Sequence, residues 1–124
     1  MMQLITIAIG GAIGAVMRFS VSNGVYTLMG RGFPWGTLTV NVIGSLAMGF
    51  LYVMFVERMA VSGEMRSLIL IGLLGAFTTF STFSIETLNL IEAGDLFQAV
   101  LNIFLSVICC IAACWAGLVI GRQL

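Results

Sequence analysis

Ten residues inside a long apolar segment decide how this chain folds: residues 75–84 read GAFTTFSTFS. Five hydroxyl side chains, three phenylalanines and one glycine make a poor straight helix, because Ser and Thr compete for backbone hydrogen bonds and Thr is stiff at χ1. The segment therefore predicts a helix that is broken near its centre. Lipid cannot satisfy freed backbone groups, so an unwound stretch at membrane depth has to be buried in protein or line a polar cavity.

The rest of the chain is too apolar for a soluble domain. Of its 124 residues, 60% are hydrophobic and 8% are charged, and the formal net charge is zero. A soluble domain carries about a quarter charged residues. One bilayer crossing takes about 20 helical residues, so the chain has room for four crossings with short loops. We therefore expect an all-α membrane protein whose residues 1–124 form a single four-helix transmembrane domain.

Hydropathy places four helices between three polar turns. The expected helices are Leu4–Met29, Trp35–Val56, a third that begins near Leu68 and resumes over Ile85–Ile91, and Leu96–Gly121. The turns are residues 31–34, 57–66 and 92–95. Pro34 suits the first turn of a new helix, which supports the start of the second one.

The arginines give only a weak preference for one orientation. Four crossings put both termini on the side that holds Arg58, Arg66 and Arg122, while the other side has Arg31 and, deeper, Arg18. The positive-inside rule orients a chain by such a difference, and this difference is small. We therefore expect insertion in both orientations and assembly as an antiparallel homodimer, which would also shield polar residues inside the membrane.

Several function classes are excluded or disfavoured. A nucleic-acid partner is not expected, because the neutral chain has no basic cluster to neutralise phosphates. Cys109, Cys110 and Cys114 lie in one apolar run and there is no His, so they are interpreted as small packing residues rather than a disulfide or zinc set. An enzyme is not expected either, because buried acid–base groups are almost absent.

Polar residues follow one face of three helices at helical spacing. In this reading the three stripes together line a narrow path, and the alternative is that they and the glycines at 10, 14, 44 and 49 only bring helices together. The stripes are Thr37, Asn41 and Ser45 in the second helix, Thr78 or Thr79, Thr82 and Glu86 in the third, and Asn102, Ser106 and Cys110 in the fourth.

Two charges and two aromatic rings stand out near these stripes. Arg18 and Glu86 are the only charges well inside the apolar spans, and such charges mark either a function or a pair unless they reach the interface. Phe80 and Phe83 lie three residues apart. The positive edge of an aromatic ring favours a small anion in a dry path, although the same spacing also suits core packing.

The chain resembles the CrcB or Fluc fluoride channels of bacterial membranes. The resemblance rests on GGAIGAVMRF at residues 10–19, GTLTVNVIGS at residues 36–45 and GLLGAFTTFSTFS at residues 72–84, with Glu86 just after. The motifs occur in order, the resemblance covers nearly the whole chain, and the third motif is highly specific.

This resemblance implies a dual-topology homodimer in the bacterial inner membrane, with two antiparallel fluoride pores and a structural sodium ion at the dimer axis. It implies that the backbone carbonyls of Gly75 and Thr78 from both subunits hold the sodium. The pore residues would be Asn41, Phe80 and Phe83. The vestibule or polar track would contain Thr37, Thr82, Glu86, Ser106 and Arg18. At Asn102 and Cys110 the chain departs from some relatives, so their contacts with the ion stay open.

The implied function is passive export of cytoplasmic fluoride down its electrochemical gradient, which reduces fluoride toxicity. In acidified surroundings fluoride enters the cell as HF, which then releases the fluoride anion inside. The alternative is a proton-coupled exporter similar to the small multidrug transporters. Their mechanism depends on a Glu in the first helix, which this chain lacks, so Glu86 would have to replace it in a different geometry. A third possibility, a membrane subunit that transports nothing, gives no reason for the hydroxyl run.

Overall fold

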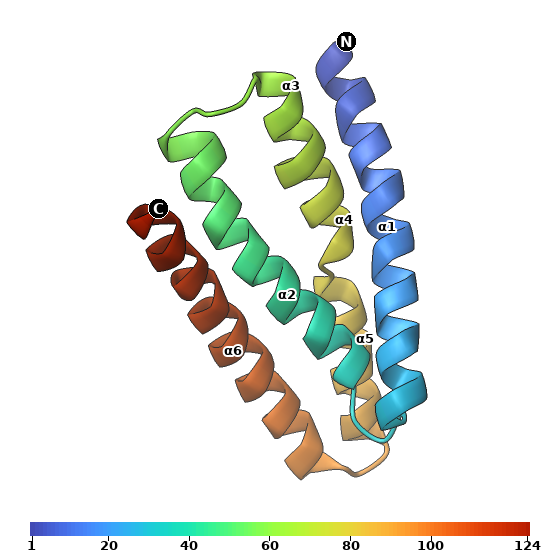
Figure 1. Cartoon of the computed structure of the whole chain (residues 1–124). Coiled ribbons are helices and arrows are strands. Elements are labelled where there is room, and N and C mark those ends of the chain that lie inside the picture. The colour runs from blue at the N-terminus through green and yellow to red at the C-terminus, as the bar shows by residue number, and fades with distance from the viewer.

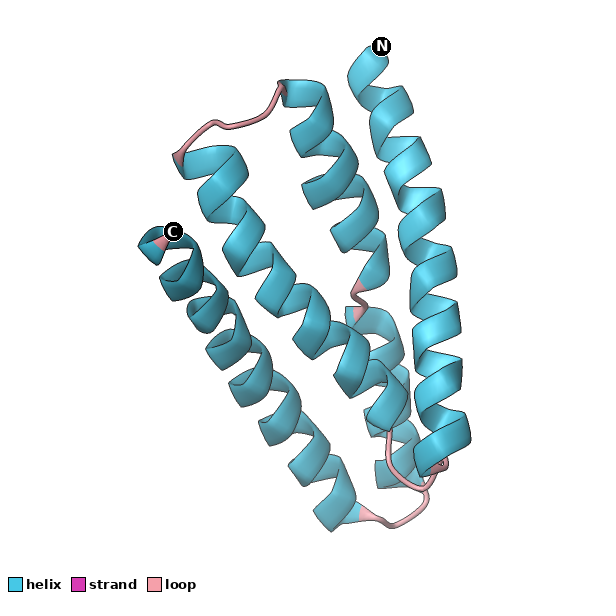
Figure 2. Cartoon of the chain, in the orientation of Figure 1, coloured by secondary structure: helices cyan, strands magenta, loops and turns pink.

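The computed structural model describes residues 1–124 and is helical apart from short connections. Figure 2 shows these connections, including a short one between α4 and α5. The α-helices are α1 (Met2–Met29), α2 (Trp35–Tyr52), α3 (Gly63–Arg66), α4 (Leu74–Phe77), α5 (Phe80–Glu92) and α6 (Leu96–Gln123). Two π-helical segments, η1 (Val53–Glu57) and η2 (Ser67–Leu73), continue α2 and join α3 to α4.

Four helical stretches are long and apolar enough to cross a membrane, which confirms the prediction of an all-helical chain with four such segments. They are Met2–Met29, Trp35–Glu57, Gly63–Glu92 and Leu96–Gln123. Figure 1 shows both termini at the same end as the loop between η1 and α3. The order of the four stretches along the chain is the one that hydropathy predicted.

Two boundaries of the third stretch differ from the prediction. Helical structure begins at Gly63 rather than near Leu68, because Ser62 caps it by accepting a hydrogen bond from the backbone N–H of Met65 at 3.2 Å. The second part begins at Phe80 rather than Ile85. Only Thr78 and Thr79 have extended backbone, so the later hydroxyl residues belong to the first turns of α5.

Glycines let the helices approach closely, as the packing alternative predicted. In Figure 1, α1 runs beside the segment that contains η2 and α4, and α2 runs beside α6. A Cβ atom at Gly10 or Gly14 would overlap the backbone of η2, and one at Gly49 would overlap the backbone of α6. Gly44 differs, because a Cβ there would meet the side chain of Thr78.

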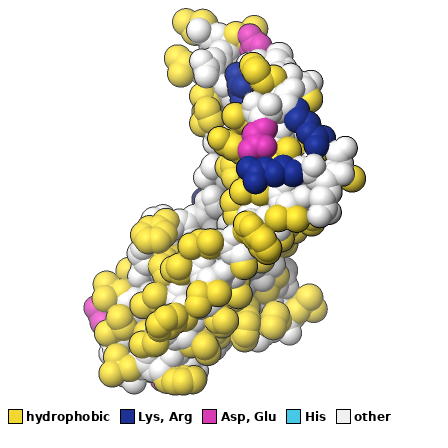
Figure 3. All heavy atoms as spheres, turned by 90° about the vertical axis from the view of Figure 1, so that its left-hand side faces the viewer, with side chains coloured by type: hydrophobic (Ala, Val, Ile, Leu, Met, Phe, Trp, Pro, Cys, Tyr) yellow, Lys and Arg dark blue, Asp and Glu magenta, His cyan; other side chains and the backbone are white.

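The outer surface is apolar along most of its length. Only 23 of 124 residues are buried, and large hydrophobic side chains such as Phe97 and Ile111 are exposed. Figure 3 shows a largely hydrophobic face with most charged side chains gathered near the end that carries the termini. There Arg122 forms an ion pair with Glu57 at 2.8 Å. Such a surface suits lipid around the middle and water at the end.

Candidate functional site

A cavity of about 400 Å³ lies where α2, α6 and the connection between α4 and α5 meet. Eight of the residues that the sequence singled out line it: Asn41, Ser45, Thr78, Thr79, Phe80, Phe83, Ser106 and Cys110. The others lie elsewhere, namely Arg18, Thr37, Gly75, Thr82, Glu86 and Asn102.

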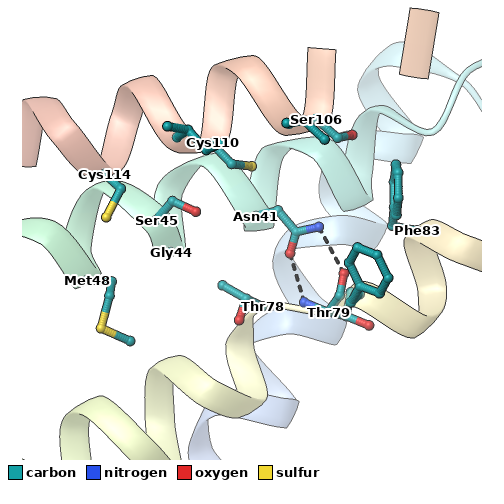
Figure 4. A pocket seen from close by; sticks show the side chains of 13 residues that line it. Asn41, Gly44, Ser45, Met48, Thr78, Thr79, Phe83, Ser106, Cys110 and Cys114 are labelled. Atoms are coloured by element: carbon teal, nitrogen blue, oxygen red, sulfur yellow. Dashed lines mark hydrogen bonds between the residues drawn. The ribbon is translucent and has the colours of Figure 1, made fainter. Parts of the chain in front are cut away.

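Asn41 joins α2 to the connection between α4 and α5 by two hydrogen bonds. Its Nδ2 donates to the backbone carbonyl of Thr79 at 2.9 Å, and its Oδ1 accepts from the backbone N–H of Thr79 at 2.7 Å (Figure 4). Thr79 cannot pair within a helix because its backbone is extended. The Asn41 side chain therefore satisfies both polar groups of that residue, and its second N–H stays available at the cavity wall.

The extended residues end one helix and begin the next. Thr78 has φ −87° and ψ 159° and Thr79 has φ −151° and ψ 124°, between the end of α4 and the start of α5. The Thr79 hydroxyl oxygen caps α5 by accepting from the backbone N–H of Thr82 at 3.2 Å, and it donates to the Thr82 hydroxyl at 3.1 Å. This explains why Thr82 has a capping contact instead of a place on the cavity wall.

Phe80 and Phe83 lie side by side in the wall of this cavity. Their ring centroids are 5.3 Å apart and their planes are inclined by 46°. Phe83 is buried, whereas Phe80 is 77% exposed. Inclined rings present both faces and edges, and the electropositive edges are the parts that favour an anion.

Asn102 has a structural contact away from this cavity. Its side chain is buried and its Nδ2 donates to the Thr87 hydroxyl at 2.8 Å, while Thr87 donates to the Phe83 carbonyl at 2.7 Å. Ser106 in turn donates to Asn102 Oδ1 at 3.3 Å. The polar stripe of α6 therefore divides: Asn102 fixes α6 to α5, whereas Ser106 and Cys110 line the cavity.

Thr37 and Glu86 meet at a second place, through a residue that the sequence analysis did not single out. The Tyr26 hydroxyl donates to Glu86 Oε2 at 2.7 Å and lies 3.4 Å from the Thr37 hydroxyl. Because the phenol has only one proton, Thr37 is the donor in the second contact. A buried Tyr hydroxyl needs a partner, so a lone Tyr within an apolar helix was the available signal.

A smaller cavity of about 290 Å³ lies beside these hydrogen bonds and is lined in part by Tyr26, Arg31 and Glu86. The Arg31 guanidinium lies 4.5 Å from the centroid of the Tyr26 ring, a distance at which a cation is attracted to the ring face. Glu86 Oε1 is buried and has no hydrogen-bond partner. The carboxyl group is thus held through one oxygen only.

Arg18 lies on α1, outside both cavities, and forms no ion pair with Glu86. Its Nε is buried without a hydrogen-bond partner. The chain has no group of three or more His, Cys, Asp or Glu residues placed to hold a metal ion. A cation near the first cavity would therefore depend on backbone carbonyl, hydroxyl or sulfur atoms.

Comparison with known proteins adds an independent finding. A profile of the family described as CrcB-like protein, Camphor Resistance (CrcB), matches residues 5–118. The chain is 56% identical over 123 residues to a protein of Methylococcus capsulatus, and this covers 99% of the chain and 54% of that protein. It is 54% identical over 121 residues to a protein of Magnetococcus marinus, covering 98% of each.

A protein of Coxiella burnetii is 55% identical over 124 residues, which cover 99% of the chain and 100% of that protein. The chain thus spans about half the length of the Methylococcus protein and nearly all of the other two. Each of the three relatives is named fluoride-specific ion channel FluC.

Proposed function

The chain belongs to the CrcB family, and from that membership we propose that it is a fluoride channel and not an enzyme. It is a multi-pass membrane protein with four helices able to span a bilayer. The observation that carries the proposal is the first cavity, where Asn41, Phe80 and Phe83 come together beside the connection between α4 and α5. Fluoride moves passively through this cavity, from the cytoplasm outward across the bacterial inner membrane.

The chemistry of the cavity wall suits a small, strongly hydrated anion. Fluoride gives up water only where fixed hydrogen-bond donors and positive edges replace it. Asn41 has one N–H left after its pairing with Thr79, and the phenylalanine rings contribute positive edges. The N-terminal end of α5 also lies at this cavity, and helix N-termini favour negative charge.

Glu86 lies in the smaller cavity and not among these donors. An ionised carboxylate in the narrow part of the path would repel an anion, so its separate position agrees with fluoride conduction. We place Glu86, Thr37, Thr82 and Arg18 in the vestibule or along the polar track. Ser106 continues the polar track along α6. The multidrug-type exporter is the weaker candidate, because no acidic residue lies on α1.

Assembly as an antiparallel homodimer is part of the proposal. Phe80 is 77% exposed although it lines the cavity, so the channel wall is incomplete in one chain. A shallow depression lined by Phe80, Ser84 and Leu88 continues from it along α5. A second copy of the chain packed there would cover these side chains and close the path. The weak arginine bias allows the two copies to have opposite orientations.

The same proposal includes a sodium ion at the dimer axis, held by the carbonyls of Gly75 and Thr78 from both subunits. The donor type fits, because carbonyl oxygens bind hard cations and no carboxylate lines this region. Gly75 is exposed and a Cβ there would have only one distant neighbour, Leu70 O at 3.9 Å. This leaves room for a second chain to approach. Thr78 lies where helical hydrogen bonding ends.

Fluoride efflux from liposomes that contain only this protein tests the function. Efflux should be driven by the fluoride gradient alone, should carry charge, and should be accompanied by little chloride. Equal chloride flux, or a strict need for a proton gradient, would reject the channel and favour an exporter. Exchange of sodium for a large organic cation during purification should lower fluoride flux or dimer yield. If both stay unchanged after all sodium has been removed, the structural sodium ion is rejected.

A further inference from the structure

Three sulfur-containing side chains line the first cavity. They are Cys110 and Cys114 of α6 and Met48 of α2, and Figure 4 shows them around one side of the cavity, away from Phe83. All three cysteines of the chain are free. The third cysteine, Cys109, does not line this cavity. The chain therefore has two thiols and one thioether on the cavity wall. Cys109, a thiol outside the cavity, serves as an internal control.

The spacing of the two thiols suits a shared metal ion. Residues four apart on a helix have Cβ atoms about 5–6 Å apart on the same face, and this applies to Cys110 and Cys114. A zinc–thiolate bond is about 2.3 Å long, so two thiolates on one ion are at most about 4.6 Å apart. Rotation about the two χ1 angles covers that separation. Met48 approaches the same space from the opposite helix.

The donor atoms decide which ion fits. Thiolate and thioether sulfur are soft ligands that select soft cations such as Cu(I), whereas hard cations prefer oxygen. No carboxylate and no imidazole lines this cavity. We propose that Cys110, Cys114 and Met48 form a binding site for a soft monovalent metal cation, Cu(I) or Ag(I). On binding, each cysteine releases its thiol proton to water and forms a sulfur–metal bond, and no atom changes oxidation state.

Occupation of this site would obstruct ion movement. The sulfur atoms share the cavity with Asn41, Phe80 and Phe83, so a bound cation fills space on the proposed path. Two thiolates and one monovalent cation also leave the occupied site with one net negative charge, which would repel an anion. This consequence rests on the proposed fluoride conduction, whereas metal binding itself does not.

Binding is tested by native mass spectrometry of the full-length protein with silver nitrate, in chloride-free buffer because silver chloride precipitates. Wild type and Cys109→Ser should each bind one silver ion per chain at low micromolar silver. Even the loss of an outer-shell partner costs about 10–100-fold in metal affinity, so the double variant Cys110→Ser with Cys114→Ser should bind at least about a hundredfold more weakly. Met48→Leu, which keeps both thiols, should show a smaller loss. Undiminished binding by the double variant would overturn the site.

Fluoride efflux from liposomes, measured with and without silver, tests the consequence. Each variant is scored as the fraction of its own flux that silver removes, since the cavity variants differ in basal flux. Silver should block fluoride efflux by wild type and by Cys109→Ser, and it should not reduce efflux by the double variant. Block that persists in the double variant would overturn the inference. If wild type moves no fluoride without silver, the proposed function fails, and the mass measurement still decides the metal site.

Discussion

The hydroxyl of Tyr26 donates a 2.7 Å hydrogen bond to Glu86, which lies 60 positions further along the chain. It is the only protein partner that the carboxylate has, because Oε1 has none. A side chain at position 36 would displace the Tyr26 ring, since a Cβ there would lie 2.5 Å from Cε2. Gly36, Thr37 and Arg31 therefore surround the ring and fix the direction of its hydroxyl group.

Tyr26→Phe should destabilise the protein, because it removes this donor and leaves Glu86 unpartnered. Removing one partner of a buried hydrogen bond costs about 1–3 kcal/mol, and we expect a loss toward the lower end because the site is only partly buried. Thermal unfolding of the purified protein measures the change, and fluoride efflux should also fall as Glu86 becomes free to rotate. Tyr52→Phe is the control, since Tyr52 is exposed at 43%. Equal behaviour of the two variants would contradict the role of Tyr26.

Asn41→Asp should lower fluoride flux strongly. Aspartate can still accept from the Thr79 N–H, but it cannot donate to the Thr79 carbonyl and it places a negative charge at the cavity. The unpaired carbonyl costs about 1–3 kcal/mol. Flux and dimer yield are measured on the same preparation. Asn23→Asp serves for comparison on a side chain outside both cavities, and wild-type flux in a folded Asn41→Asp protein would mean that ions pass elsewhere.

Phe80→Ile and Phe83→Ile should each reduce flux, because they keep an apolar side chain and remove the aromatic edge. The two variants should differ in stability: Phe83 is buried and Phe80 is 77% exposed, so only Phe83→Ile should lower the unfolding temperature clearly in the single chain. Phe97→Ile, at a residue 79% exposed on α6, controls for loss of any surface ring. Retained flux in both pore variants would make the pair structural.

A volume-conserving change in the packed interior should affect stability slightly and leave ion conduction unchanged, unlike the changes at the cavity wall. Leu70 is buried in η2 and does not line the first cavity. Leu70→Ile should cost less than about 1.5 kcal/mol and leave fluoride selectivity unchanged in the efflux assay. A change of selectivity in this variant would show that packing, and not the cavity wall, controls ion choice.

Gly14→Ala should destabilise the bundle, although alanine is the better helix former. Its Cβ would overlap the carbonyl oxygen of Leu73, so α1 would have to move away from η2. Overpacking of this kind costs about 1–3 kcal/mol. Gly24→Ala on the same helix has no atom within 4 Å of the new Cβ, and it should stabilise the chain by up to about 1 kcal/mol. Thermal unfolding of both variants tests whether close approach or helix propensity dominates.

Orientation in the membrane can be read from a tag at either terminus. If both orientations occur, the tag should be accessible from both faces of the membrane in the same cells. Arginines added to the loop at residues 58–62 should abolish this mixture and lower channel activity, because a few basic residues decide a marginal topology. Gln3→Arg should act in the same direction, because Gln3 lies beside Gly63 and Arg66, next to this loop. One orientation only in the unmodified chain would remove the basis for the antiparallel dimer.

The sequence by itself determined the four apolar helices and their order. Hydropathy over a window of about 20 residues is a local property of the sequence. In lipid, such a segment satisfies its backbone hydrogen bonds by forming a helix. The packing alternative also predicted that glycines at positions 10, 14, 44 and 49 let backbones approach closely, which holds at 10, 14 and 49 but not at 44. Hydropathy placed the start of the third helix too late, because the Ser62 cap adds a turn before Leu68.

Only the tertiary structure decided which partner each polar side chain has. From the sequence, Asn41 and Asn102 look alike, each on a polar stripe of an apolar helix. In the structure Asn41 pairs with the backbone of Thr79, 38 positions away, while Asn102 binds Thr87, 15 positions away and outside the cavity. Helical spacing determines which side chains share a face, but the partner across the gap depends on how the helices cross. For that reason the Tyr26–Glu86 contact could not be predicted from the sequence.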